Sequence, residues 1–138
     1  MKRYEQFPHT ADIGVRVFGK DMKELFENAA FAMFDIIADL ENISGDIVET
    51  FDLEASDHDV LLVAWLDELL YNFYTRHMIF YKFQIDELTD THIKATATGR
   101  PIGANRNRLK TEIKAATYSG LNIKSSGKSC EVEIIFDV

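Results

Sequence analysis

The segment from Val60 to Phe73 constrains the fold of this chain more than any other. Most of its side chains are apolar: Leu61, Leu62, Val63, Trp65, Leu66, Leu69, Leu70 and Phe73. In a helix they would cover most of the surface, and a helix of that kind has to be substantially buried. We therefore predict a helix from about Val60 to Arg76 that packs against a sheet.

Another helix is predicted from about Met22 to Ala38, where apolar residues recur at helical spacing. Asp21 precedes this segment and Glu24 follows three residues later, which is a variant of the capping box. Before the other helix, the residues Ser56–Asp59 offer several side-chain oxygens for capping. Both segments thus carry a start signal as well as a helical pattern.

The other predicted elements are strands. They are Glu5–Phe7 ended by Pro8, Ile13–Val17, Ile47–Ala55, Ile79–Glu87, His92–Arg100 and Ser129–Val138, and the alternation within Arg108–Leu121 permits one more. Strands outnumber helices and do not alternate strictly with them. This pattern favours an α+β fold, a single domain over residues 1–138 with two layers, in which two main helices pack on a mostly antiparallel or mixed sheet.

The charge of the chain narrows the classes of function. A formal net charge of -8 argues against a broad basic surface that grips a phosphate backbone. One basic stretch runs through Arg100, Arg106, Arg108, Lys110 and Lys114. This stretch is equally compatible with contact to RNA or a partner protein and with a solvated loop.

Cysteine use and hydropathy bear on the compartment. The single cysteine, Cys130, excludes an intramolecular disulfide, and its place among alternating apolar residues predicts a buried core thiol. No apolar run approaches the ~20 residues that a membrane helix needs. The start of the chain lacks the apolar stretch of a signal peptide, so we expect a cytoplasmic protein without a membrane partner.

Two aspartates at strand ends form the most suggestive constellation. Asp12 opens one predicted strand and Asp137 closes another. If these strands pair antiparallel, the start of one lies beside the end of the other, and the two carboxylates converge. Val138 would add its carbonyl and terminal carboxylate. A hard cation such as calcium or magnesium prefers oxygen ligands of this kind, although two unrelated solvated aspartates at strand ends explain the pattern more simply.

Other polar residues have simpler explanations beside the functional ones. His9 could neighbour a metal, dock a partner or act as an acid or base, and a hydrogen-bonded structural histidine is the plainer alternative. Asp57 and His58 resemble part of a ligand cluster, but helix capping explains the aspartate more simply. We keep His9, Asp57 and His58 as candidate docking residues or metal neighbours, and we predict no catalytic residue.

Several stretches in order resemble the archease family. They are His9–Gly14, Glu24–Ala30 followed by Ala32–Phe34, Leu61–Tyr71, Lys114–Tyr118 and the pair Asp137-Val138. The resemblance covers essentially the whole chain. It departs where relatives often carry an acidic residue in place of Pro8, an asparagine in place of Asp67 and a histidine in place of Ser119. None of these departures touches Asp12, Asp137 or Val138.

The resemblance implies a cofactor protein of an RtcB-type RNA ligase, not an enzyme. Such a ligase serves tRNA splicing and RNA repair, and archeases promote its GTP-dependent guanylylation and multiple turnover. The family's divalent metal site, most often calcium with magnesium or manganese as alternatives, would map onto Asp12, Asp137 and Val138. RNA would then be contacted only through the ligase, and the oligomeric state stays open.

Two other classes of function compete with this one. A general chaperone or modulator of nucleic-acid-processing enzymes would need no metal ligand. A metal-dependent hydrolase is permitted by the carboxylate pair, but too few further catalytic groups can be named.

Overall fold

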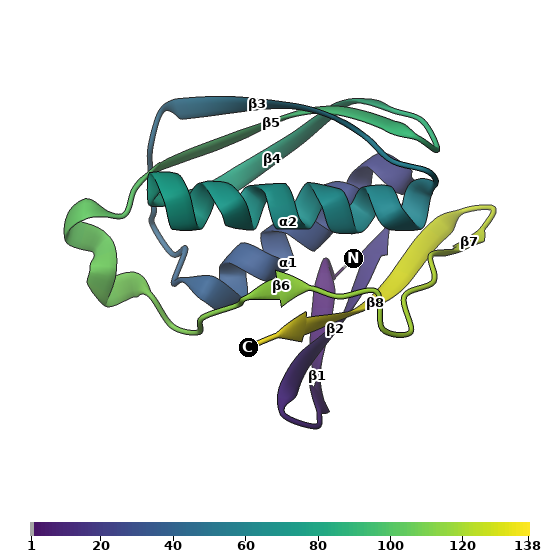
Figure 1. Cartoon of the computed structure of the whole chain (residues 1–138), viewed down its shortest axis with the longest axis horizontal. Helices are drawn as coiled ribbons and strands as arrows, with labels where there is room; N and C mark the ends of the chain where they lie inside the picture. The colour runs from purple at the N-terminus through teal and green to yellow at the C-terminus, as the bar shows by residue number, and fades with distance from the viewer. Residues whose placement is uncertain (1) are drawn as a thin grey trace.

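The computed structural model describes residues 2–138, and its strands form two antiparallel sheets with the two long helices between them (Figure 1). The first sheet has the order β1-β2-β8-β6, with β7 also paired to β8, and the second has the order β3-β5-β4. The strands of the first sheet are β1 (Tyr4–His9), β2 (Asp12–Gly19), β6 (Ala115–Ala116), β7 (Lys124–Ser126) and β8 (Ser129–Asp137). Those of the second sheet are β3 (Ile47–Glu54), β4 (Met78–Leu88) and β5 (His92–Pro101).

The helices are α1 (Met22–Ile37), α2 (His58–Arg76) and the 3-10 helix η1 (Gly103–Arg108). The α+β class is therefore confirmed, but the strands divide between two sheets and the molecule has three layers where we predicted two. The apolar circumference of α2 gives the physical reason, because a single sheet would cover only one side of it.

Both predicted helix caps are confirmed. The Asp21 carboxylate accepts a hydrogen bond from Glu24 N at 2.8 Å, and Asp57 accepts one from Val60 N at 2.9 Å. The returning bond of the capping box goes one residue further back than in the usual motif, since Glu24 accepts from Lys20 N at 3.0 Å.

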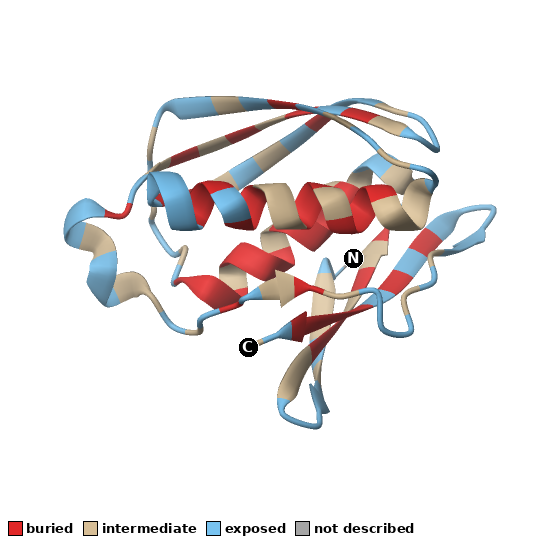
Figure 2. Cartoon of the chain, viewed as in Figure 1, coloured by how far each residue is buried: buried red, intermediate tan, exposed pale blue. Residues whose placement is uncertain are grey.

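Aromatic side chains fill the space between the helices and the second sheet. Phe34, Phe51, Trp65, Phe80 and Phe83 meet one another mostly edge to face, with ring centroids 5.3–6.4 Å apart. The indole of Trp65 is fully buried and donates to the Phe26 carbonyl at 3.1 Å. Figure 2 shows buried residues along α1, α2 and strands of both sheets.

Small residues in β5 bring its neighbours close. Ala95 and Ala97 are buried, as predicted for positions where another layer approaches. At Gly99 a Cβ would overlap the main-chain carbonyl of Ile79 in β4, so only glycine fits without movement of the backbone.

One predicted strand boundary was wrong. β1 continues through Pro8 to His9, and this is tolerated because β1 is an edge strand. The further strand that the alternation within Arg108–Leu121 permits is present, but it spans only Ala115–Ala116. Side chains of α2 bind the main chain of this segment where a longer strand would pair with its neighbour. Tyr74 donates to the Ile113 carbonyl at 2.6 Å, and Asp67 accepts from Ala116 N at 2.9 Å.

The remaining local predictions hold. The turn before β8 is a hairpin with Gly127 at a φ of 53°. Cys130 is buried. Over residues 2–138, no helix is long and apolar enough to cross a membrane.

Candidate metal site at the strand ends

The pairing of β2 with β8 brings Asp12 and Asp137 to one edge of the first sheet. The two strands are antiparallel, with Ile13 opposite Phe136. Asp12 precedes Ile13 and Asp137 follows Phe136, so the two aspartates lie at the same end of the strand pair. On the other side of β8, Ala115 of β6 lies opposite Asp137. The strand pairing on which the predicted site depends is therefore confirmed, while its metal stays a prediction.

A tight turn between β1 and β2 sets the position of Asp12. His9 pairs with Asp12 across the two-residue link Thr10-Ala11, and His9 Nδ1 lies 3.7 Å from Asp12 Oδ2. Ala11 has a φ of 59°, in the left-handed region that costs a non-glycine residue roughly 1–2 kcal/mol. Strained backbone of this kind persists where the surrounding structure holds it, and it concentrates at functional sites.

The main chain around Asp137 is held from its β6 side. Lys114 N donates to the Asp137 carbonyl at 2.7 Å, and both the amide and the hydroxyl of Thr117 donate to the Ile135 carbonyl. The Asp137 side chain is exposed and has no ion pair or hydrogen bond with residues 2–138. Its carboxylate is therefore free for a ligand, and the half-buried side chain of Val138 packs on the core beside it.

Asp67 is a site-supporting residue that the sequence did not single out. It lies on α2, and its Oδ1 accepts from Ala116 N at 2.9 Å, which fastens β6 to the helix. Burial raises the pKa of its carboxyl, against the smaller opposing effect of that hydrogen bond. The signal in the sequence was an acidic residue next to Leu66 on a largely apolar helix, where a half-buried carboxyl needs a hydrogen-bond donor.

The donor set fits a hard cation. Asp12 and Asp137 supply carboxylate oxygens, the ligands that calcium and magnesium prefer. Among residues 2–138 no three His, Cys, Asp or Glu side chains come close enough to hold a metal. Two carboxylates leave most positions of a six- to eight-oxygen shell to main-chain oxygens, water or groups of a partner.

Asp57 and His58 do not belong to this site. Asp57 caps α2, and His58 lies 3.3 Å from Asp59 and 3.9 Å from Asp90. Figure 1 shows the start of α2 and the β1–β2 turn well apart. The predicted candidates therefore split into one group at the strand ends, which includes His9, and one at the start of α2.

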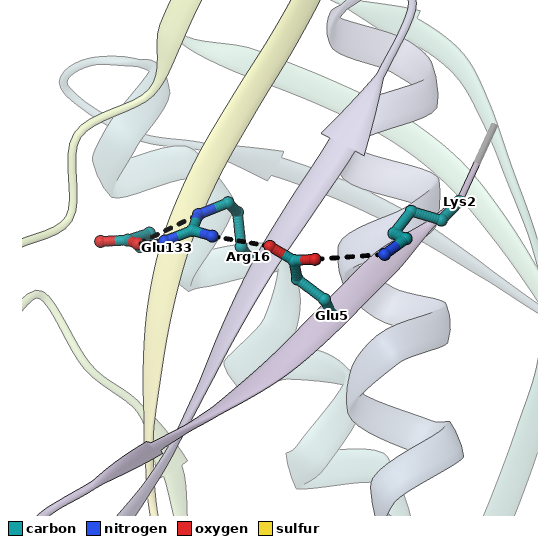
Figure 3. A network of polar contacts seen from close by, with 4 residues as sticks. All are labelled: Lys2, Glu5, Arg16 and Glu133. Atoms are coloured by element: carbon teal, nitrogen blue, oxygen red, sulfur yellow. Dashed lines mark hydrogen bonds and ion pairs between the residues drawn. The ribbon is translucent and has the colours of Figure 1, made fainter.

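A charge network crosses the outer face of the same sheet (Figure 3). Arg16 of β2 forms ion pairs with Glu5 of β1 and Glu133 of β8, each at 2.6 Å. Lys2 joins the network through an ion pair with Glu5 at 3.3 Å. The hydrogen bond from Arg16 holds the pKa of Glu5 below its usual range. The network thus joins the three strands whose ends carry His9, Asp12 and Asp137.

The basic stretch divides into structural and free side chains. Arg100 donates to the Ser44 carbonyl at 3.2 Å, and Arg108 donates to the carbonyls of Asp39 and Glu41 at 3.0 and 2.8 Å. The side chains of Arg106, Lys110 and Lys114 have no partner among residues 2–138. Only these three remain available to a ligand or partner.

Comparisons with known proteins agree on one family. The sequence model of the archease protein family (MTH1598/TM1083) matches residues 4–138. The protein archease of Methanosarcina mazei is 38% identical, over 99% of this chain and 97% of its own length. A protein archease-like of Dictyostelium discoideum is 33% identical, over 100% of this chain and 95% of its own.

Two solved structures share the fold. The solution structure of Methanobacterium thermoautotrophicum protein 1598 superposes with a TM-score of 0.84 at 34% identity, with 100% of both chains covered. A crystal structure from Thermotoga maritima, described as an archease and possible chaperone, gives a TM-score of 0.68 at 19% identity and covers 97% of this chain and 96% of its own.

Proposed function

This chain belongs to the archease protein family, and we propose that it is an accessory protein that activates an RtcB-type RNA ligase. The register of β2 with β8 carries this proposal, because it sets the two family-matching aspartates side by side. The family resemblance implies the client enzyme, which joins RNA ends during tRNA splicing and repair.

The proposed role of the strand ends is to hold a divalent cation. Calcium is the first candidate, and magnesium and manganese are the alternatives. Asp12 and Asp137 would bind it, and the ion would supply positive charge where the ligase handles GTP and phosphate. His9 lies 3.7 Å from Asp12 and would orient that carboxylate. The Lys114–Asp137 hydrogen bond fixes the main chain beside the other one.

The acidity of the chain supports docking on a basic protein surface. A net charge of -8 steers association toward positive partners and away from an RNA backbone. RNA would therefore be reached through the ligase. In this proposal the chain is an activator and carries no catalytic residue of its own.

A general chaperone role is the second candidate. The Thermotoga maritima structure with the same fold is described as a possible chaperone, which favours it. A holding function would depend on exposed apolar surface and not on two carboxylates at a strand end.

The test counts ligations for each molecule of an RtcB-type ligase from the same source, with GTP, metal and excess RNA carrying 3′-phosphate and 5′-hydroxyl ends. We expect the chain to convert single turnover into multiple turnover. Asp12→Asn and Asp137→Asn should remove the stimulation, whereas Asp46→Asn is the matched control, because Asp46 is exposed and has no side-chain contact among residues 2–138.

Calcium titration by calorimetry separates the metal from the ligase. Each of the two strand-end variants should bind calcium at least about tenfold more weakly, since it loses a charged oxygen ligand. Full stimulation by a folded Asp12→Asn protein would contradict the proposal. Protection of unrelated client proteins by that variant would favour the chaperone role in its place.

A further inference from the structure

A second candidate ligand site lies away from the strand ends, where the C-terminal ends of α1 and α2 meet η1. A pocket of about 440 Å³ opens there. Its floor is apolar and buried, formed by Ile37, Phe73 and Ile102. The volume lies within the range of roughly 300–1,000 Å³ typical of small-molecule sites.

Hydrogen bonds fix the walls of this pocket. Lys110 N donates to the Ile37 carbonyl at 2.8 Å, and Ile102 N donates to the His77 carbonyl at 2.7 Å. Tyr74, which lines the pocket, is held by the bond from its hydroxyl to the Ile113 carbonyl. Because each wall is tied to a helix or to its neighbour, the pocket is formed before any ligand arrives.

The rim carries free positive charge. Arg106 lines the pocket, and it alone of the six arginines has no hydrogen bond, ion pair or aromatic partner for its side chain among residues 2–138. Lys110 lies on the same rim and is likewise unpaired. Glu112 offsets one of these two charges.

An apolar floor under unpaired cations selects the chemistry of the ligand. The body of the ligand should be aromatic or apolar, to cover Phe73 and the two isoleucines. Its polar group should be an anion with several acceptor oxygens, because the guanidinium fork and the ammonium of Arg106 and Lys110 offer donors suited to a phosphate.

We propose that this pocket binds a small free aromatic phosphate monoester, with its ring on the apolar floor and its phosphate between Arg106 and Lys110. None of the pocket residues lies at Asp12 or Asp137. The pocket therefore shares no residue with the proposed metal site, and its test needs neither the metal nor the ligase.

The test titrates the protein with 1-naphthyl phosphate, followed by NMR shifts and calorimetry, beside the neutral 1-naphthol and inorganic phosphate. We expect the naphthyl phosphate to bind at least about tenfold more tightly than either fragment. Arg106→Gln and Lys110→Gln should each weaken it several-fold or more, and Glu112→Gln should tighten it.

Lys114→Gln is the matched control, because Lys114 is an exposed, unpaired lysine outside the pocket. It should leave the affinity unchanged. Equal affinity for 1-naphthol, an equal loss in Lys114→Gln, or no binding of the phosphate at millimolar concentration would each overturn the proposal. The exposed Arg106 side chain has no hydrogen bond or ion pair among residues 2–138, so its variant should fold normally.

Discussion

The two sheets bury their inner faces in different ways and present different outer features. The β3-β5-β4 sheet covers an aromatic cluster that includes Phe51, Phe80 and Phe83. The β1-β2-β8-β6 sheet packs mainly aliphatic side chains inward and carries the Arg16 network outward. The proposed metal ligands stand at its strand ends. The contrast is that the second sheet encloses the aromatic part of the core, whereas the first sheet also carries an exposed charge network and two carboxylates at its strand ends.

The largest effect should follow a truncation beneath the second sheet. Phe80→Ala removes a fully buried ring from the aromatic cluster, and such a change costs about 3–5 kcal/mol. Urea unfolding followed by the fluorescence of Trp65, the only tryptophan, measures it. Tyr71→Ala, at an aromatic side chain on α2 that is 62% exposed, should cost far less. Similar losses in both variants would remove the distinction between core and surface.

A pair of glycine substitutions compares the two sheets directly. Gly99→Ala drives a methyl group into the Ile79 carbonyl, and overpacking of this kind costs about 1–3 kcal/mol. Gly14→Ala meets only the ring of Phe7 on an edge strand, which can turn away, so its cost should stay below about 1 kcal/mol. Thermal unfolding of both variants tests the order. The reverse order would mean that Phe7 is held as firmly as main chain.

The contact between α2 and β6 should show in the pH dependence of stability. Because burial raises the pKa of Asp67, the folded state holds that proton more tightly than the unfolded chain. Its contribution to stability therefore falls as pH rises from the ordinary value of ~3.9 through the raised one.

Asp67→Asn keeps the acceptor for Ala116 N and removes this titration. At neutral pH the variant should equal or slightly exceed the parent in stability, because it keeps the hydrogen bond and buries no charge. Denaturant unfolding between about pH 4 and 7 measures the difference. If the stability of the parent rose relative to that of the variant as pH increased, the predicted direction of the effect would be wrong.

The smallest effect should come from the outer face of the first sheet. Arg16→Ala breaks both ion pairs with Glu5 and Glu133, but exposed pairs contribute little and are screened by salt. We expect a slight loss of thermal stability at low ionic strength that disappears at high salt. A loss that persists in molar salt would show that packing of Arg16 near the Phe7 ring matters more than its charge.

Local features were predictable from the sequence, whereas the pairing of strands was mostly not. Asp21 and Asp57 cap their helices as expected, because a cap depends on neighbours within one turn. The division into two sheets was missed, since alternation shows which face of a strand is buried but not which strand lies beside it.

The candidate site could be predicted from the sequence only by assuming that the strands of Asp12 and Asp137 pair. Antiparallel β2 and β8 place Asp12 by Asp137, and the structure has that pairing. The sequence marked Asp67 as unusual but did not identify its partner, because the contact with Ala116 joins separate elements. The pocket at Arg106 was missed for the same reason, as its walls come from three separate segments.

The pairing of Ile13 with Phe136 also sets an order of events during translation. β2 leaves the ribosome early, and one of its two sheet neighbours is made only after most of the chain has been synthesised. Long-range strand pairing of this kind is slow and leaves an open edge on the waiting strand. Half of the carboxylate pair therefore exists throughout synthesis, and the other half arrives with β8. Metal capture would then report that β8 has docked, and a stalled or shortened chain would lack that capacity.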